Sequence, residues 1–196
     1  NKGDDVISGG SGGDRLDGGQ GADTIAGGAG GDRILGRDGD DTVRGGAGDD
    51  NMRGDTGSDT LYGGAGNDRI KGGSGDDELH AGAGNDTVAG GRGTDTAVFD
   101  GNRGDYSVSR ADESVTVTGS GGAATLHGIE TAKFADQDID VSELAPAGDP
   151  GGSGGATASG GSGGSTASGG SGGATASGGS DGSTASGGSG GATASG

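Results

Sequence analysis

The chain has 196 residues, 57 of them Gly, and its 30 Asp and Glu against 12 Lys and Arg give a net charge of −18. Apolar residues make up 25% and aromatic residues 2% of the chain, too few for the core of an ordinary globular domain, so the composition predicts a repeat solenoid or disorder. The acidic balance excludes nucleic acid as a natural partner and favours cation binding, and the lack of Cys excludes disulfides and thiolate metal sites.

Residues 1–98 repeat a nine-residue unit in a single register, of which residues 63–71 (GGAGNDRIK) are a clean copy. The fourth position is always Gly, and the eighth is always apolar, from Ile7 to Ala97. The sixth position is always aspartate: Asp5, Asp14, Asp23, Asp32, Asp41, Asp50, Asp59, Asp68, Asp77, Asp86 and Asp95. A fixed period shared by three chemically different positions indicates a stacked repeat architecture.

The first six positions of the unit predict a turn, because glycine adopts positive φ without steric cost. The last three place one aliphatic residue between two mostly polar ones, as in Arg69-Ile70-Lys71, which predicts a very short strand with one side chain inward. Stacked copies would bury a continuous aliphatic ladder. Basic side chains beside the aliphatic position, such as Arg69 and Lys71, are expected to point outward into solvent.

The aspartate column predicts a bound cation. Stacked strands lie about 4.8 Å apart, and carboxylates at roughly that distance repel by about 3 kcal/mol per neighbouring pair near the protein surface. One aliphatic anchor per nine residues does not offset this repulsion together with the cost of ordering so many glycines. The repeats are therefore expected to be disordered unless a hard divalent cation neutralises the column, and carboxylate and carbonyl oxygens suit Ca²⁺.

The unit resembles the Gly-Gly-x-Gly-x-Asp-x-U-x nonapeptide (U, aliphatic) of the RTX, or repeats-in-toxin, calcium-binding proteins. This resemblance implies an all-β fold, a right-handed parallel β-roll with two nonapeptides per coil and several Ca²⁺ ions between stacked turns. It implies ligands from the carbonyls at positions two and four and the Asp of one turn, and from the carbonyls at positions one and three and the Asp of the turn above. Carried over, one ion lies between Gly10, Gly12, Asp14, Gly28-Ala29 and Asp32, and a next ion involves Gly30, Asp32 and Asp50. Across the roll, the implied ligands are the aspartates of the column and the glycines Gly10, Gly12, Gly19, Gly21, Gly28, Gly30, Gly39, Gly46, Gly48, Gly57, Gly64, Gly66, Gly73 and Gly75.

Three positions depart from the family pattern, since Arg37 and Asp55 replace the second Gly and Ala81 replaces the first. A left-handed backbone suits Asp moderately and Arg poorly. The turn through residues 37–39 is therefore expected to fit the pattern least.

Residues 99–145 predict a small antiparallel β cap, because Gly thins and strands with alternating apolar residues are expected at 106–109, 115–118, 123–134 and 139–144. An open solenoid end exposes unpaired backbone, so a capping element is expected there. Segments 99–106, 128–130 and 134–136 are similar to the cap that follows the β-roll in RTX proteins such as serralysin-type metalloproteases.

Residues 146–196 predict a third region, a low-complexity tail of Gly, Ser, Ala and Thr that also repeats every nine residues. It keeps Gly-Gly-x-Gly but loses both the Asp and the aliphatic position. We interpret it as a linker-like tail, with a packed glycine-rich or matrix-interacting array as the alternative.

The sequence carries no catalytic constellation, so this chain is not expected to be an enzyme. Gly-x-Ser-x-Gly at 9–13 and 151–155 follows from composition, because a nucleophile elbow also needs a core strand and a His partner. The two Arg-Gly-Asp tripeptides are interpreted as coincidental, and His80 and His127 lack metal-binding spacing. No apolar run is long enough to predict a membrane span.

The first functional hypothesis is a calcium-binding module that folds outside the cell, the C-terminal part of a secreted bacterial protein that uses type I secretion machinery. The absence of an initiating Met and the start within a repeat favour this interpretation. One alternative is a structural cell-surface, S-layer, adhesin or biofilm-matrix protein that self-assembles. Another is a non-catalytic targeting or stability module of a secreted protease, lipase or alginate epimerase.

Overall fold

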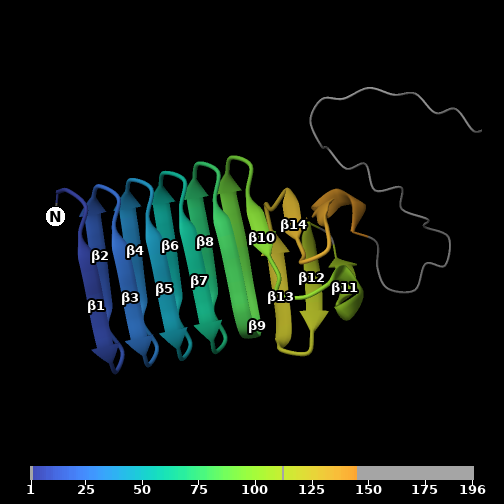
Figure 1. Cartoon of the computed structure of the whole chain (residues 1–196), viewed down its shortest axis with the longest axis horizontal. Helices are drawn as coiled ribbons and strands as arrows, with labels where there is room; N and C mark the ends of the chain where they lie inside the picture. Colours follow the sequence, from blue (N-terminus) through green and yellow to red (C-terminus); the bar gives the residue numbers. More distant parts are fainter. Residues whose placement is uncertain (1, 112, 145–196) are drawn as a thin grey trace, which may run out of the picture. The chain divides into compact units, whose positions relative to one another are not determined.

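The computed structural model describes residues 2–111 and 113–144, and strands dominate both segments. The repeat region forms the strands drawn from blue to green in Figure 1: β1 (Val6–Ser11), β2 (Arg15–Gln20), β3 (Thr24–Ala29), β4 (Arg33–Asp38), β5 (Thr42–Ala47), β6 (Asn51–Thr56), β7 (Thr60–Ala65), β8 (Arg69–Ser74), β9 (Glu78–Arg92) and β10 (Thr96–Val98). Within these two segments no helix has the length and apolarity needed to cross a membrane.

Each strand pairs in parallel with the strand two repeats away, so the register advances by two nonapeptides per coil, as in the pair Ile7 and Ile25. Strands β1, β3, β5, β7 and the first part of β9 form one layer, and β2, β4, β6, β8 and the last part of β9 form the other. The prediction of an all-β parallel β-roll with two nonapeptides per coil is confirmed, with about five coils.

The strands are longer than the three residues expected from the repeat. Most are six residues long, because the parallel ladder continues through the glycines of the following turn, as in the pair Gly10 and Gly28. The single apolar residue at the eighth position therefore marks where each strand is buried, but it does not show how long the strand is.

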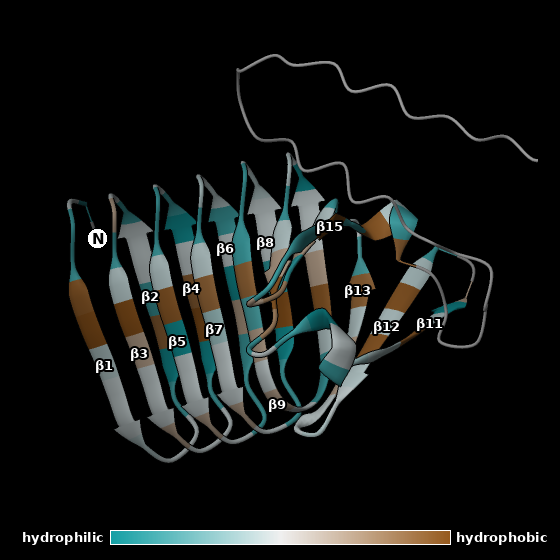
Figure 2. Cartoon of the chain, turned by 45° about the vertical axis from the view of Figure 1, so that its right-hand side comes forward, coloured by the Kyte–Doolittle hydropathy of each residue, from teal (hydrophilic) through white to brown (hydrophobic). Residues whose placement is uncertain are grey.

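The eighth position builds the core between the two layers. Its side chains are at most 1% exposed in the central coils: Ile25, Ile34, Val43, Met52, Leu61, Ile70, Leu79 and Val88. Figure 2 shows these hydrophobic segments side by side as a band across successive strands. The flanking basic side chains Arg15, Arg33, Arg69 and Lys71 are exposed, as the repeat predicts.

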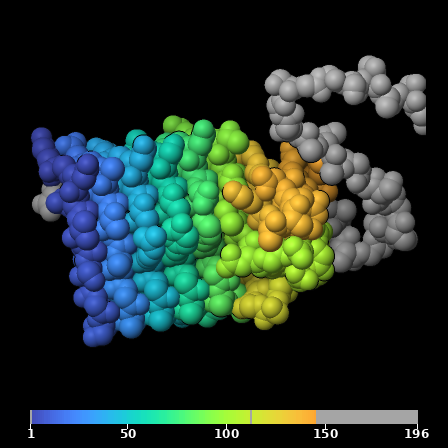
Figure 3. Space-filling model, in the orientation of Figure 1, coloured from blue at the N-terminus to red at the C-terminus, as the bar shows by residue number. Residues whose placement is uncertain are grey.

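The cap is only partly antiparallel as predicted, because two of its strands first continue the two layers of the roll in parallel. Strand β13 (Gly122–His127) pairs in parallel with the end of β9, and β14 (Thr131–Lys133) pairs in parallel with β10. The remaining cap elements pair antiparallel with these or connect them: β11 (Ser107–Ala111), β12 (Ser114–Gly119), β15 (Asp138–Asp140) and the 3₁₀ helices η1 (Arg103–Asp105) and η2 (Val141–Glu143). Figure 3 shows the cap atoms packed against the green end of the roll.

Two of the expected cap strands differ in the structure. The segment 123–134 is two strands, because Gly128 has a φ of +53° and reverses the chain between them. The segment 139–144 ends as the 3₁₀ helix η2, which Asp140 caps by accepting a hydrogen bond of 2.8 Å from the amide of Ser142.

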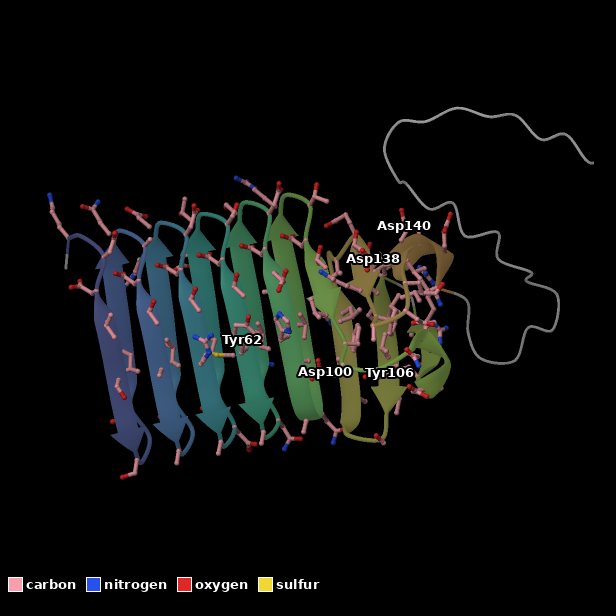
Figure 4. All side chains as sticks on the ribbon, viewed as in Figure 1. Tyr62, Asp100, Tyr106, Asp138 and Asp140 are labelled. Carbon is pink, nitrogen blue, oxygen red and sulfur yellow. The ribbon has the colours of Figure 1, made fainter. Side chains whose placement is uncertain are left out.

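An aromatic cluster fills the centre of the cap. The ring of Phe99 lies 5.2 Å from that of Phe134, and the ring of Tyr106 lies 5.5 and 5.4 Å from these two. The Tyr106 hydroxyl donates a hydrogen bond to the carbonyl of Asp100, and Figure 4 shows the two residues together. The expected tail at 146–196 lies outside the described residues.

Candidate metal centres

The turns at both edges of the roll use the second and fourth Gly of each repeat. All the glycines that the sequence predicts as ligands have positive φ, with Gly28 at +118° and Gly30 at +113° as examples. These angles lie in a region of backbone conformation that residues with a Cβ rarely adopt. A Cβ added to Gly28, for example, would overlap the carbonyl oxygen of Gly10 in the preceding coil.

The two substituted turns keep the same backbone. Arg37 has a φ of +94° and Asp55 a φ of +82°, so neither substitution breaks the coil. Each side chain forms an ion pair on the surface, Arg37 with Asp17 at 2.7 Å and Asp55 with Arg53 at 2.6 Å. The hydrogen bond from Arg37 lowers the pKa of the Asp17 carboxyl. Arg37 has the unfavourable backbone angle that the sequence predicts, but the turn through residues 37–39 still follows the same path as the other turns.

The aspartates of the sixth position form two columns, one along each edge. One column contains Asp5, Asp23, Asp41, Asp59, Asp77 and Asp95, and the other contains Asp14, Asp32, Asp50, Asp68 and Asp86. Within a column, each backbone amide donates to Oδ1 of the next aspartate, at 2.8 Å for Asp23 to Asp41. From Asp23 onward these residues are at most 4% exposed. The hydrogen bonds therefore fix the orientation of each carboxylate.

The second carboxylate oxygen, Oδ2, has a different environment. Within the described residues it is buried without a hydrogen-bond partner in Asp5, Asp14, Asp23, Asp32, Asp41, Asp50, Asp59, Asp68, Asp77 and Asp95. Six of these ten atoms belong to one aspartate column and four to the other, and we call the whole set the Oδ2 column. A buried charged oxygen that lacks a partner is costly, and its regular recurrence indicates a positively charged ligand.

Backbone carbonyls converge on the Oδ2 column beside the first Gly of each repeat. A Cβ added to Gly9 would lie 2.6 Å from both Oδ2 of Asp14 and the carbonyl oxygen of Gly27. At Gly45 the corresponding position lies close to Oδ2 of Asp50 and 2.7 Å from the carbonyl oxygen of Gly63. Only glycine leaves this space open, so the repeats that begin with Gly present a small cradle lined by oxygen atoms, whereas Ala81 places a methyl group at this position.

The donor set of the cradle is carboxylate plus carbonyl. Residues 2–111 and 113–144 contain no group of three or more His, Cys, Asp or Glu side chains placed to hold one ion. Hard cations such as Ca²⁺ accept this mixture of carboxylate and backbone oxygens, whereas softer metals prefer imidazole or thiolate. The residues present therefore fit calcium.

Burial raises the pKa of the sixth-position carboxyls from Asp41 to Asp95. It raises the pKa of Asp59 to about 7 and those of Asp41, Asp68 and Asp77 to about 6. The amide hydrogen bond lowers each pKa and so opposes this effect, while neighbouring carboxylates raise it further. Two adjacent charges in this column are therefore unfavourable unless a cation lies between them.

The predicted site residues all lie in these turns. The first-position carbonyl that the family resemblance implies is that of Gly27, which lies beside Oδ2 of Asp14. The sequence missed one group of oxygen atoms in the cap, where Glu130 accepts a hydrogen bond of 2.8 Å from the amide of Asp95.

The other polar residues considered from the sequence lie apart from the cradles. His80 stacks on Tyr62, with ring centroids 4.3 Å apart, and its Nε2 lies 2.8 Å from Glu78. Figure 4 shows Tyr62 on β7. The second Arg-Gly-Asp tripeptide forms the 3₁₀ helix η1 of the cap.

Comparisons with known proteins agree with the repeat pattern. The profile of the RTX calcium-binding nonapeptide repeat (4 copies) matches residues 1–34, 26–61 and 62–97. Among solved structures, the chain is similar to the extracellular lipase LipA from Serratia marcescens, at 19% identity and a TM-score of 0.21, covering 65% of this chain and 36% of that chain. No curated protein sequence matches the chain. Residues 1–97 belong to the family of RTX calcium-binding nonapeptide repeats.

Proposed function

We propose that this chain is a calcium-binding module that folds when it meets calcium outside the cell, as part of a secreted bacterial protein. The Oδ2 column supports this proposal most directly, because it is a regular series of buried carboxylate oxygens directed at carbonyl oxygens of the next coil. Family membership of the repeats supports the choice of calcium as the ion.

Each proposed ion lies at one edge of the roll and connects two successive coils. Its ligands would be an aspartate oxygen of the Oδ2 column and backbone carbonyls from the glycine positions of both turns, such as that of Gly27 beside Asp14. Bound calcium supplies the positive charge that neutralises the column and takes six to eight oxygen ligands.

The same geometry makes folding depend on calcium. The core offers one fully buried aliphatic residue per repeat, such as Leu61, while each coil adds two buried carboxylates. At neutral pH these carboxylates oppose stacking, as their raised pKa values indicate. Extracellular calcium modules bind with dissociation constants of about 10⁻⁴–10⁻³ M. A chain with such sites would stay unfolded in the cytosol, which suits export, and would fold outside.

A calcium titration of the full chain tests this proposal. Far-UV circular dichroism is recorded after calcium is removed by chelation, with magnesium as the matched control. We expect a cooperative gain of β signal in the micromolar-to-millimolar range with calcium and none with magnesium. A β spectrum that is the same with and without chelator would contradict calcium-dependent folding.

The two alternative roles depend on other parts of the protein. A role in surface or matrix assembly would use the tail at 146–196, which lies outside the described residues. It predicts calcium-dependent filaments or cell attachment, whereas a monomer by light scattering in calcium would contradict it. A role as the non-catalytic module of a secreted enzyme predicts that a separate catalytic domain is linked to these repeats.

A further inference from the structure

The last aspartate of one column faces the cap rather than another repeat. Asp95 is 0% exposed and belongs to the Oδ2 column, so its second carboxylate oxygen is buried. In every earlier turn of that edge the next coil is a nonapeptide, 18 residues further on. After Asp95 the chain instead runs through the first cap strands and returns at residue 128.

The returning segment takes the place of the missing repeat. The amide of Asp95 donates a hydrogen bond of 2.8 Å to Oε2 of Glu130, just as the amide of Asp77 donates one of 3.0 Å to Oδ1 of Asp95. The amide of Thr131 then donates to the carbonyl of Asp95, as the amide of Thr96 does to that of Asp77. Glu130 therefore stands where the sixth-position aspartate of a further coil would stand.

The sequence of this segment shows the same correspondence. Residues 128–132 read GIETA and residues 93–97 read GTDTA, so both have a Gly two residues before the acid and Thr-Ala after it. The two stretches lie in register, because Ala132 pairs with Ala97 across β14 and β10. The cap thus contains the last six positions of a repeat, with Glu in place of Asp.

The oxygen-lined cradle is also present at this position. A Cβ added to Gly90 would overlap both Oδ2 of Asp95 and the carbonyl oxygen of Gly128. In the repeats, the corresponding carbonyl comes from the first residue of the next coil, as with Gly63 beside Asp50. The cap therefore supplies one carbonyl and one carboxylate to the last turn.

The opposite edge ends differently. There β13 runs beside β9 without a turn, and Ala124 pairs with Asp86, so the cap places no carboxylate opposite that aspartate. The carboxylate at position 130 is consequently specific to one edge. It is also not needed for strand pairing, which β14 makes through its backbone.

We propose that Glu130 and the carbonyl of Gly128 complete a terminal calcium site with Asp95, and that this ion fastens the cap to the roll. This proposal rests on the calcium-dependent folding proposed above. It adds that the cap is itself a calcium ligand, so that closure of this end of the roll depends on calcium.

The test compares the full chain with the variants Glu130→Gln and Glu143→Gln. Glutamine at 130 can still accept the hydrogen bond from Asp95 but is a weaker, uncharged ligand. Glu143, in η2, is an exposed cap acid and serves as the matched control. Bound calcium per chain is counted by equilibrium dialysis, and hydrogen exchange of residues 122–134 is followed as calcium is titrated.

We expect Glu130→Gln to bind one ion fewer than the wild type and to need at least about tenfold more calcium to protect residues 122–134. Protection of residues 24–65 should be unchanged, and Glu143→Gln should match the wild type throughout. If Glu130→Gln keeps the wild-type number of ions and the wild-type midpoint, the terminal site is wrong while the calcium module stands. If the wild type itself binds no calcium, the proposed function is wrong.

Discussion

The amide of Asp23 lies 2.8 Å from Oδ1 of Asp41, one coil further along the roll, and this bond ties the backbone of one turn to the carboxylate of the next. The bond fixes one oxygen of Asp41 and leaves Oδ2, a member of the Oδ2 column, facing the cradle. The aspartate therefore has two roles, since one oxygen aligns the coils and the other is available to a cation.

The first prediction concerns pH in the absence of calcium. Burial raises the pKa of Asp59 to about 7 and those of Asp41, Asp68 and Asp77 to about 6, from the ordinary value of 3.8. A raised pKa in the folded state means that folding favours the protonated form. This contribution is fully present below about pH 4 and is lost as the pH rises through 6 to 7. Acidic pH should therefore stabilise the folded chain in the absence of calcium, as calcium does at neutral pH.

The measurement is thermal unfolding of the calcium-free chain, followed by circular dichroism at pH 4.5 and pH 7.5. We expect a more folded and more stable chain at the lower pH. The control is the same pair of measurements in saturating calcium, where the difference should shrink because calcium replaces the protons. Lower stability at pH 4.5 than at pH 7.5 without calcium would contradict the raised pKa values.

The second prediction separates the charge of a central aspartate from its hydrogen bond. Asp59→Asn keeps an oxygen that can accept from the amide of Asp41, but it removes the buried charge. Without calcium at pH 8, this variant should stabilise the roll by on the order of 2–4 kcal/mol, because the charged form of Asp59 is the disfavoured one. With calcium it should be less stable than the wild type, because it loses an anionic ligand.

Urea unfolding in calcium and in chelator measures both effects, and the stability order of the two proteins should reverse between the conditions. Asp136→Asn, an exposed cap residue, is the control and should change neither midpoint appreciably. If Asp59→Asn destabilises the chain equally in both conditions, the carboxylate acts through its hydrogen bonds alone.

The third prediction concerns the open space in the cradle. Gly45 is not among the glycines with positive φ, so its backbone angles alone would allow alanine. An added Cβ would nevertheless lie close to Oδ2 of Asp50 and 2.7 Å from the carbonyl oxygen of Gly63. Gly45→Ala should therefore fill one cradle and reduce bound calcium by one ion per chain, measured by equilibrium dialysis. Gly104→Ala, where a Cβ meets no atom within 4 Å among the described residues, should bind the wild-type number. Equal binding by both variants would place the ion elsewhere.

The sequence predicted the repeat part of this arrangement well because the signal is local and periodic. Fixing the register at Asp14 and Gly10 also fixes their counterparts in every coil, and the structure places all the predicted glycines at positive φ. The preferences of Arg37 alone argue against this turn, yet its backbone has a φ of +94°. Its strand pairs with the coils on both sides, and this pairing outweighs the preference of the single residue.

The parts that the sequence missed depend on contacts between distant residues. Glu130 lies 35 residues after Asp95, not 18, so the period that locates every other acid of the column does not reach it. The split of segment 123–134 into two strands has the same origin, because Gly128 turns the chain to follow both layers of the roll.

The fourth prediction uses the strained backbone of Arg37. Both Arg37→Gly and Arg37→Ala lose the exposed ion pair with Asp17, so this loss does not distinguish them. Only alanine keeps a Cβ in the left-handed region, which costs about 1–2 kcal/mol. Arg37→Gly should therefore be the more stable variant by about 1 kcal/mol in saturating calcium, measured by urea unfolding. Equal midpoints would show that the turn relaxes around the side chain.

The fifth prediction concerns the aliphatic ladder. Leu61 is 0% exposed and pairs with Val43 and Leu79 in the neighbouring coils, so Leu61→Ala leaves a cavity that two rigid layers enclose. It should destabilise the calcium-bound roll by about 2–5 kcal/mol. Leu16, only partly buried, is the matched control, and Leu16→Ala should have a clearly smaller effect on the urea midpoint. Because calcium binds the folded state, excess calcium should recover part of the lost stability in both variants. If the Leu61→Ala loss were no larger than that of Leu16→Ala, the ladder would contribute little, and the ions alone would hold the coils together.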